Sequence, residues 1–133
     1  MSMSGRYLLD TNIVISLIAK EPSTHEHIAS ATEIFIPAIV LGELYYGAHK
    51  SQKVPENTSR IDEFAASNTI LPCDMDTAKR YGEIKNRLKL KGRPIPENDI
   101  WIAALAQQYV LTLASNDAHF TEIDDLRTET WSS

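Results

Sequence analysis

The chain alternates short apolar segments with longer stretches in which apolar residues recur every three or four positions. The apolar segments predict strands at 7–9, 34–36, 70–71 and 111–115, with a last one near 128–131. The periodic stretches predict helices after residue 10, at 21–31, 37–47, 60–67 and 74–92, and from 98 or 99 to about 109. Strands and helices in alternation predict an α/β fold, a sandwich whose mainly parallel central sheet is flanked by helices on both faces.

Local signals set several boundaries. Asp74 is a suitable N-cap for the longest helix, and Gly92 ends it. Pro37 suits the first position of a helix. The polar segment 50–59 contains Pro55, so we expect a loop there.

Length and composition indicate one soluble domain spanning residues 1–133. Hydrophobic residues make up 43% of the chain and charged residues 23%, as in ordinary globular proteins. No apolar run is long enough to cross a bilayer, and the polar start is not a secretory signal, so we expect a cytoplasmic protein without membrane contact. Cys73 is the only cysteine, which excludes an internal disulfide and a multi-cysteine zinc site.

Two aspartates follow predicted strands. Asp10 ends the first strand, and Asp117 lies two residues beyond Ser115 at the end of a later one. Ligands of open α/β sheets bind off the carboxyl ends of the strands, so both side chains are expected at one edge. Each also has a simpler interpretation, because Asp is a common helix N-cap and turn residue.

Two further acids lie among apolar neighbours on predicted helices. Glu43 is flanked at helical spacing by Ile39, Val40, Tyr46 and Gly47, and Asp99 by Ile102, Ala103, Ala106 and Val110. A carboxylate on an inward face needs a cation, a hydrogen-bonding partner or a wet cleft. For Asp99, as for Asp10, a helix N-cap is about as good an explanation as a metal ligand.

Together the four acids favour a site for a hard cation. An all-oxygen set suits Mg²⁺, or Mn²⁺ as the alternative, rather than Zn²⁺. Such an ion can activate water for attack on a phosphodiester. The net charge of -5 argues against nucleic-acid binding. That objection weakens if the acids gather where metal ions bind.

At these residues the sequence resembles the PIN-domain family, especially the VapC-type toxins of bacterial toxin–antitoxin modules. The similar segments cover nearly the whole chain and are 7–12, 42–48, 98–104 and 115–120, followed by 126–131. Asp117 is chosen over Asn116 as the fourth acid because it stands three residues before Phe120, as in the family pattern.

The resemblance implies a single PIN domain and a metal-dependent endoribonuclease. Its metal-binding and catalytic residues would be Asp10, Glu43, Asp99 and Asp117, supported by Thr11, Asn12 and Ser115. It further implies an RNA substrate, inhibition by a cognate VapB-type antitoxin, and a homodimer.

Other interpretations remain at this point. An RNA-processing or DNA-directed nuclease of the same fold would carry the same acids. A phospho-receiver domain is disfavoured because Asp10 is followed by Thr11-Asn12 and no lysine follows the last strand. An inactive binding module is disfavoured because all four acids are present. The basic residues between Lys85 and Arg93 suit a solvated helix face slightly better than an RNA contact. The four histidines lack metal-ligand spacing, although His119 lies near Asp117.

Overall fold

Five parallel strands form the central sheet. The computed structural model describes residues 5–131, and its strands are β1 (Arg6–Leu9), β2 (Glu33–Pro37), β3 (Thr69–Leu71), β4 (Thr112–Ala114) and β5 (Thr128–Glu129). They are arranged in the order β3-β2-β1-β4-β5, and every neighbouring pair is parallel. The predicted α/β fold with a parallel sheet is therefore confirmed.

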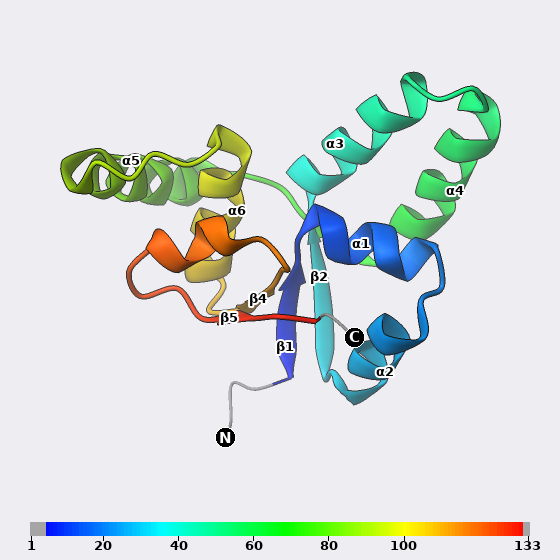
Figure 1. The fold of residues 1–133 in the computed structure, drawn as a ribbon, viewed down its shortest axis with the longest axis horizontal. Helices are drawn as coiled ribbons and strands as arrows, with labels where there is room; N and C mark the ends of the chain where they lie inside the picture. The colour runs from blue at the N-terminus through cyan, green and yellow to red at the C-terminus, as the bar shows by residue number, and fades with distance from the viewer. Residues whose placement is uncertain (1–4, 132–133) are drawn as a thin grey trace.

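Helices cover both faces of this sheet (Figure 1). On one side lie α1 (Thr11–Ile18), α2 (Pro22–Ser30), α3 (Ala38–His49) and α4 (Val54–Ala66). On the other lie α5 (Met75–Lys91), α6 (Glu97–Gln108) and the short 3₁₀ helix η1 (Ala118–Glu122). The chain runs from β1 outward to β3 and then returns to β4 beyond β1. Because parallel crossovers are right-handed, this reversal of direction puts the two sets of helices on opposite faces.

The inner strands are buried on both faces. Leu8 and Leu9 are consecutive, so their side chains point to opposite faces of the sheet, and both are fully buried. In β4, Leu113 and Ala114 show the same pattern. Continuous apolar runs, rather than alternating ones, are what a parallel sheet covered on both faces requires.

The longest helix begins and ends where the sequence predicts. Asp74 accepts a hydrogen bond from the Thr77 backbone N–H, and the Thr77 hydroxyl interacts with the Asp74 backbone in return, which forms a capping box. At the other end Gly92 is left-handed, with φ of 70°. Both predictions are confirmed.

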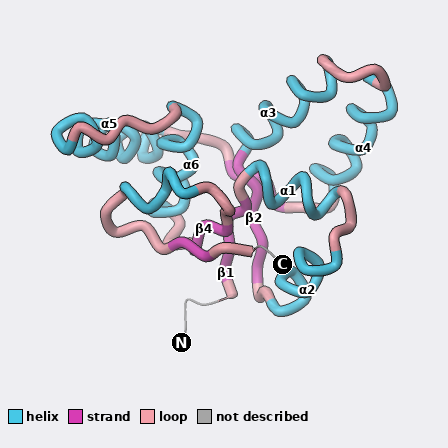
Figure 2. The backbone as a smooth tube through the Cα atoms, viewed as in Figure 1, coloured by secondary structure: helices cyan, strands magenta, loops and turns pink. Residues whose placement is uncertain are grey.

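Two predicted boundaries, those at the starts of α3 and α4, are wrong. The segment 50–59 is a loop only as far as Lys53, because α4 begins at Val54 and Pro55 lies in its first turn, where a proline costs no helical hydrogen bond. Pro37 ends β2 and caps α3 instead of opening that helix, which runs to His49. Figure 2 shows α3 and α4 as a pair that projects from the sheet and is joined by a loop at its far end.

In the part of the chain that the structure describes, we find no helix with both the length and the apolar character needed to span a membrane.

Candidate active site

The strand order creates a crevice at one edge of the sheet. β1 pairs with β2 on one side and with β4 on the other. After β1 the chain continues into α1 on one face of the sheet, and after β4 it continues into η1 on the other face (Figure 1). At such a switch point the connections diverge, which opens space beyond the carboxyl ends of the strands. Asp10 directly follows β1, and Ser115 directly follows β4. The fold therefore brings these two residues together.

Asp10 is almost fully buried, with 4% of its surface exposed, and hydrogen bonds hold both its carboxylate oxygens. Oδ1 accepts from the Thr11 backbone N–H at 2.8 Å. Oδ2 accepts from the Ser115 hydroxyl at 2.6 Å and from the Asn12 side-chain amide at 3.2 Å. Asp10 is thus both the N-cap of α1 and a fixed carboxylate in the crevice.

Asp99 and Asp117 meet at the ring of His119. Nδ1 of His119 lies 3.1 Å from Oδ2 of Asp99 and 3.0 Å from Oδ1 of Asp117. The same Asp117 oxygen accepts the His119 backbone N–H at 2.9 Å. One ligand atom from each of the three residues lies within 4.8 Å of the other two. The Asp99 side chain is the most enclosed of the three, at 13% exposed.

Ser115 links the two clusters. Its hydroxyl donates to Asp10 and accepts the Asp117 backbone N–H at 3.0 Å. A single side chain therefore fixes the distance between the aspartate after β1 and the one after β4.

Glu43 stands on the α3 side of the crevice. Oε2 accepts from the Thr11 hydroxyl at 3.1 Å, and Oε1 accepts from the Asn98 side-chain amide at 3.4 Å. These contacts place Glu43 next to the first turn of α1 and the start of α6. Glu43 is half-buried.

Several sequence expectations about these acids are wrong in detail. Tyr46 is 65% exposed, because that part of α3 projects from the sheet, so the stripe around Glu43 is only partly inward. Asp99 is not an N-cap, since α6 begins at Glu97 after Pro96. Val110 lies beyond the end of α6 and is 58% exposed. The inward neighbours Ile102 and Ala103 of Asp99 are fully buried, as expected.

Burial and mutual repulsion shift the titration of this cluster. Burial raises the pKa of Asp10, and the nearby charge of Asp117 raises it further, whereas hydrogen bonds from Ser115, Thr11 and Asn12 lower it. Burial likewise raises the pKa of Asp99, and the charges of Asp10 and Asp117 add to this, opposed by His119. The hydrogen bond to Asp99 raises the pKa of His119.

These residues fit a divalent cation. The donors are carboxylate oxygens, which Mg²⁺ and Mn²⁺ prefer, and neighbouring negative charge raises the pKa of Asp10 and of Asp99. Asp10, Asp99 and Asp117 could hold such an ion, with Glu43 at the edge of the same crevice. The hydrogen bonds from Ser115, Asn12 and Thr11 would orient the carboxylates toward it.

Two residues in contact with the acids are not predicted as part of the site. Histidine ligands are not expected because the four histidines lack metal-ligand spacing, although the position of His119 two residues after Asp117 singles it out among them. Asn98 carries no signal except that it precedes Asp99. Its contact with Glu43 spans 55 positions and depends on the tertiary structure.

Comparison with known proteins assigns the family. The sequence profile of the PIN domain matches residues 7–126. The chain belongs to the PIN-domain family. It is 40% identical over 129 residues to ribonuclease VapC2 of Haemophilus influenzae, a match that covers 95% of this chain and 98% of that protein. It is 33% identical to the tRNA(fMet)-specific endonuclease VapC of Shigella flexneri, covering 96% and 98%.

The fold agrees with the sequence. The crystal structure of VapBC2 from Rickettsia felis bound to a DNA fragment from their promoter contains a chain that superposes with a TM-score of 0.86 at 37% identity, covering 95% of this chain and 98% of that one. The chain is therefore a VapC-type ribonuclease by sequence and by fold.

Proposed function

We propose that this VapC-type PIN domain is a metal-dependent endoribonuclease and the toxin of a VapBC-type toxin–antitoxin pair, and that Asp10, Glu43, Asp99 and Asp117 form its catalytic metal site. One observation carries the proposal. Carboxylates from the ends of β1 and β4 and from the first turn of α6 converge in one crevice, where burial and mutual charge raise the pKa of Asp10 and Asp99.

The side chains around the acids have distinct roles. Thr11, Asn12 and Ser115 hold Asp10 in one orientation, so its free lone pairs stay aimed into the crevice. His119 holds Asp99 and Asp117 next to each other. When bound, Mg²⁺ would lower the pKa of a water molecule and neutralise charge that develops on the phosphodiester. Mn²⁺ has the same ligand preference and is the alternative ion.

RNA is the substrate that the relatives support, since two of them are named a ribonuclease and a tRNA(fMet)-specific endonuclease. A DNA-directed or RNA-processing nuclease of the same fold is the competing proposal. We also propose that the protein acts in the cytoplasm, where cellular RNA is found, and as a homodimer, as the family resemblance implies.

A mostly apolar cleft next to the site suits an antitoxin segment. It has a volume of about 490 Å³ and is lined from α1, α3 and α4, including Thr11, Ile15, Glu43, Leu44 and Ile61. Ile15 is 53% exposed there although it is a large apolar residue. An amphipathic segment of a VapB-type antitoxin placed in this cleft would cover Ile15 and reach the acids at its end. Ile15→Glu should then weaken inhibition by the antitoxin while leaving RNA cleavage intact.

The deciding experiment compares cleavage by the native protein with cleavage by Asp10→Asn and by Glu83→Gln, a control on the exposed surface of α5. Labelled RNA and DNA are offered side by side with Mg²⁺. We expect the native protein and Glu83→Gln to cut RNA but not DNA, and Asp10→Asn to cut neither. Cleavage of RNA by Asp10→Asn at the native rate would contradict the proposed site, and cutting of DNA would favour the competing nuclease.

A further inference from the structure

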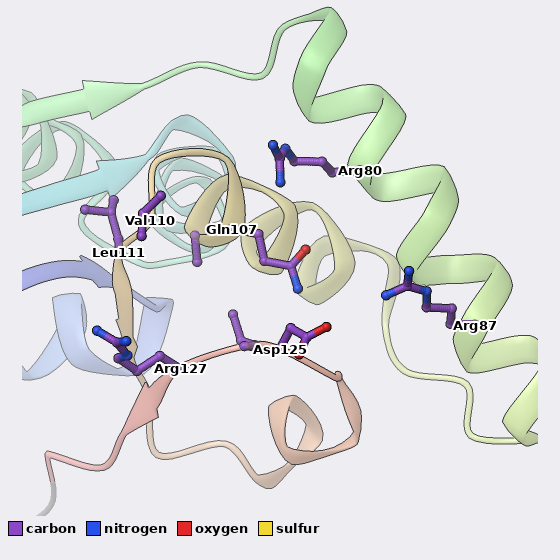
Figure 3. Close-up of a pocket in the computed structure, with 9 residues that line it drawn as sticks. Arg80, Arg87, Gln107, Val110, Leu111, Asp125 and Arg127 are labelled. Carbon is purple, nitrogen blue, oxygen red and sulfur yellow. The ribbon is translucent and has the colours of Figure 1, made fainter. Parts of the chain in front are cut away.

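Three arginines face one cavity far from the acids (Figure 3). The cavity has a volume of about 360 Å³ and lies between α5, the end of α6 and the segment that precedes β5. Its polar lining consists of Arg80, Arg87, Gln107, Asp125 and Arg127, and we call it the arginine cavity. Arg80 and Arg87 both extend from α5 toward Gln107, whereas the Arg127 side chain, on the other side of the cavity, points away from them in this view (Figure 3).

The arginine cavity opens at the opposite edge of the sheet from the candidate active site. Leu111 and Arg127, which line it, directly precede β4 and β5, whereas Ser115 directly follows β4. At about 3.3 Å per residue along a strand, Leu111 and Ser115 are about 13 Å apart. A group bound in the arginine cavity therefore does not share the space in which the acids lie.

The cavity is positive in a protein whose net charge is -5. Its lining includes three arginines and one acid, Asp125. Within the described residues, no carboxylate oxygen lies within 4.0 Å of Arg87 or Arg127, whereas other cations of α5 are paired, Lys85 with Glu97 and Lys91 with Asp124.

Arg80 is partly neutralised within α5. Its Nε is buried, makes no hydrogen bond and lies 3.5 Å from a carboxylate oxygen of Asp76, one turn earlier in the helix. Arg87 and Arg127 are therefore the arginines of this cavity whose charge is most available to an anion.

We propose that the arginine cavity binds a backbone phosphate of the RNA substrate, away from the bond that is cut; this rests on the proposed function. Arginine forks match phosphate geometry and remain charged at all relevant pH values. Outside the metal site, a protein with a net charge of -5 repels a polyanion, so a substrate with many phosphates needs a positive site elsewhere on the surface. α5 leads from this cavity to the acids, because it packs beside α6, whose first turn carries Asp99.

The test uses the double variant Arg87→Ala/Arg127→Ala. Its control is Lys53→Ala/Lys79→Ala, which removes the same charge from exposed positions outside the cavity. The probe is unfractionated transfer RNA, and its Kd is measured in EDTA, where no metal-dependent cleavage occurs. We expect the arginine variant to bind roughly tenfold or more weakly than the control variant. The slope of log K against log salt should become shallower by about 0.7–0.9 for each phosphate that the variant no longer neutralises.

A second measurement uses cleavage with Mg²⁺. The arginine variant should show a raised KM for transfer RNA with an unchanged kcat, and native kinetics on an RNA of a few nucleotides that cannot reach the cavity. Arg87→Lys/Arg127→Lys should recover part of the binding.

Three results would overturn the inference. The arginine variant could show the same Kd and salt slope as the control variant, or it could lose as much cleavage of the short RNA as of transfer RNA. A change in the molecular mass of the arginine variant in solution would instead make the cavity a subunit interface. If the native protein cuts no RNA but still binds it through these arginines, the proposed function is wrong, whereas phosphate binding by the arginine cavity is supported.

Discussion

The hydroxyl of Ser115 donates a 2.6 Å hydrogen bond to Oδ2 of Asp10, which joins two residues 105 positions apart. The same hydroxyl oxygen accepts the Asp117 backbone N–H. Ser115 therefore sets both the orientation of the first acid and the start of the turn that carries the fourth. The bond can form because β1 and β4 are neighbours and both strands end at this edge.

Ser115→Ala should keep the fold and impair the site. Residues that orient metal ligands typically contribute about 10–100-fold to metal affinity or activity, so a decrease of that size in RNA cleavage is expected. When the cleavage rate is measured at increasing Mg²⁺ concentration, Ser115→Ala should need more Mg²⁺ than the native protein to reach half of its maximal rate. Ser59→Ala, at an exposed position of α4, is the control. Native Mg²⁺ dependence in Ser115→Ala would show that this hydrogen bond does not position Asp10.

Asp99→Asn should stabilise the metal-free protein near neutral pH. Because burial and the charges of Asp10 and Asp117 raise the pKa of Asp99 in the folded state, its ionised form destabilises the fold. This penalty is present above the folded-state pKa and disappears as pH falls toward the unfolded value near about 3.9. The difference in unfolding free energy between Asp99→Asn and the native protein, measured in EDTA, should therefore shrink on acidification. A variant less stable than the native protein at pH 7 would contradict this account of the cluster.

Removing the metal should lower stability as well as activity. An ion that binds only the folded state stabilises it by about 2.7 kcal/mol at a hundred times its Kd. Mg²⁺ should raise the Tm of the native protein in a concentration-dependent way, EDTA should reverse the rise and stop cleavage, and Glu43→Gln should diminish it. If Mg²⁺ leaves the Tm of the native protein unchanged at concentrations that support cleavage, the four acids do not form a resident metal site.

Gly92→Ala and Gly82→Ala should change stability in opposite directions. Gly92 has φ of 70°, which costs an L-residue roughly 1–2 kcal/mol, and a Cβ there would meet no other atom, so only the backbone matters. Gly82 lies in the exposed interior of α5, where alanine is favoured by about 0.5–1 kcal/mol and also has room. Denaturant unfolding measures the free energy of unfolding of both variants, which should be lower than that of the native protein for Gly92→Ala and higher for Gly82→Ala. A destabilised Gly82→Ala would mean that α5 needs flexibility at that point.

Local sequence signals determined most of the fold. Short runs such as Leu8-Leu9 are apolar at consecutive positions, as a strand buried on both faces requires, and Asp74 and Gly92 fix the ends of α5 through short-range hydrogen bonds and backbone geometry. The α4 boundary was missed because Pro55 is typical of a loop, although a proline in the first turn is equally compatible with a helix.

For the site, the sequence determined which acids follow strands and which precede buried helical residues, and family resemblance selected Asp10, Glu43, Asp99 and Asp117 from the other carboxylates. Only the tertiary structure decided how they meet. The order of the strands places the ends of β1 and β4 together, and the contacts of His119 with Asp99 and Asp117 and of Asn98 with Glu43 join distant or unremarkable positions. The arginine cavity arises in the same way, because Arg87 and Arg127 are 40 positions apart in the sequence and line one cavity only in the folded chain.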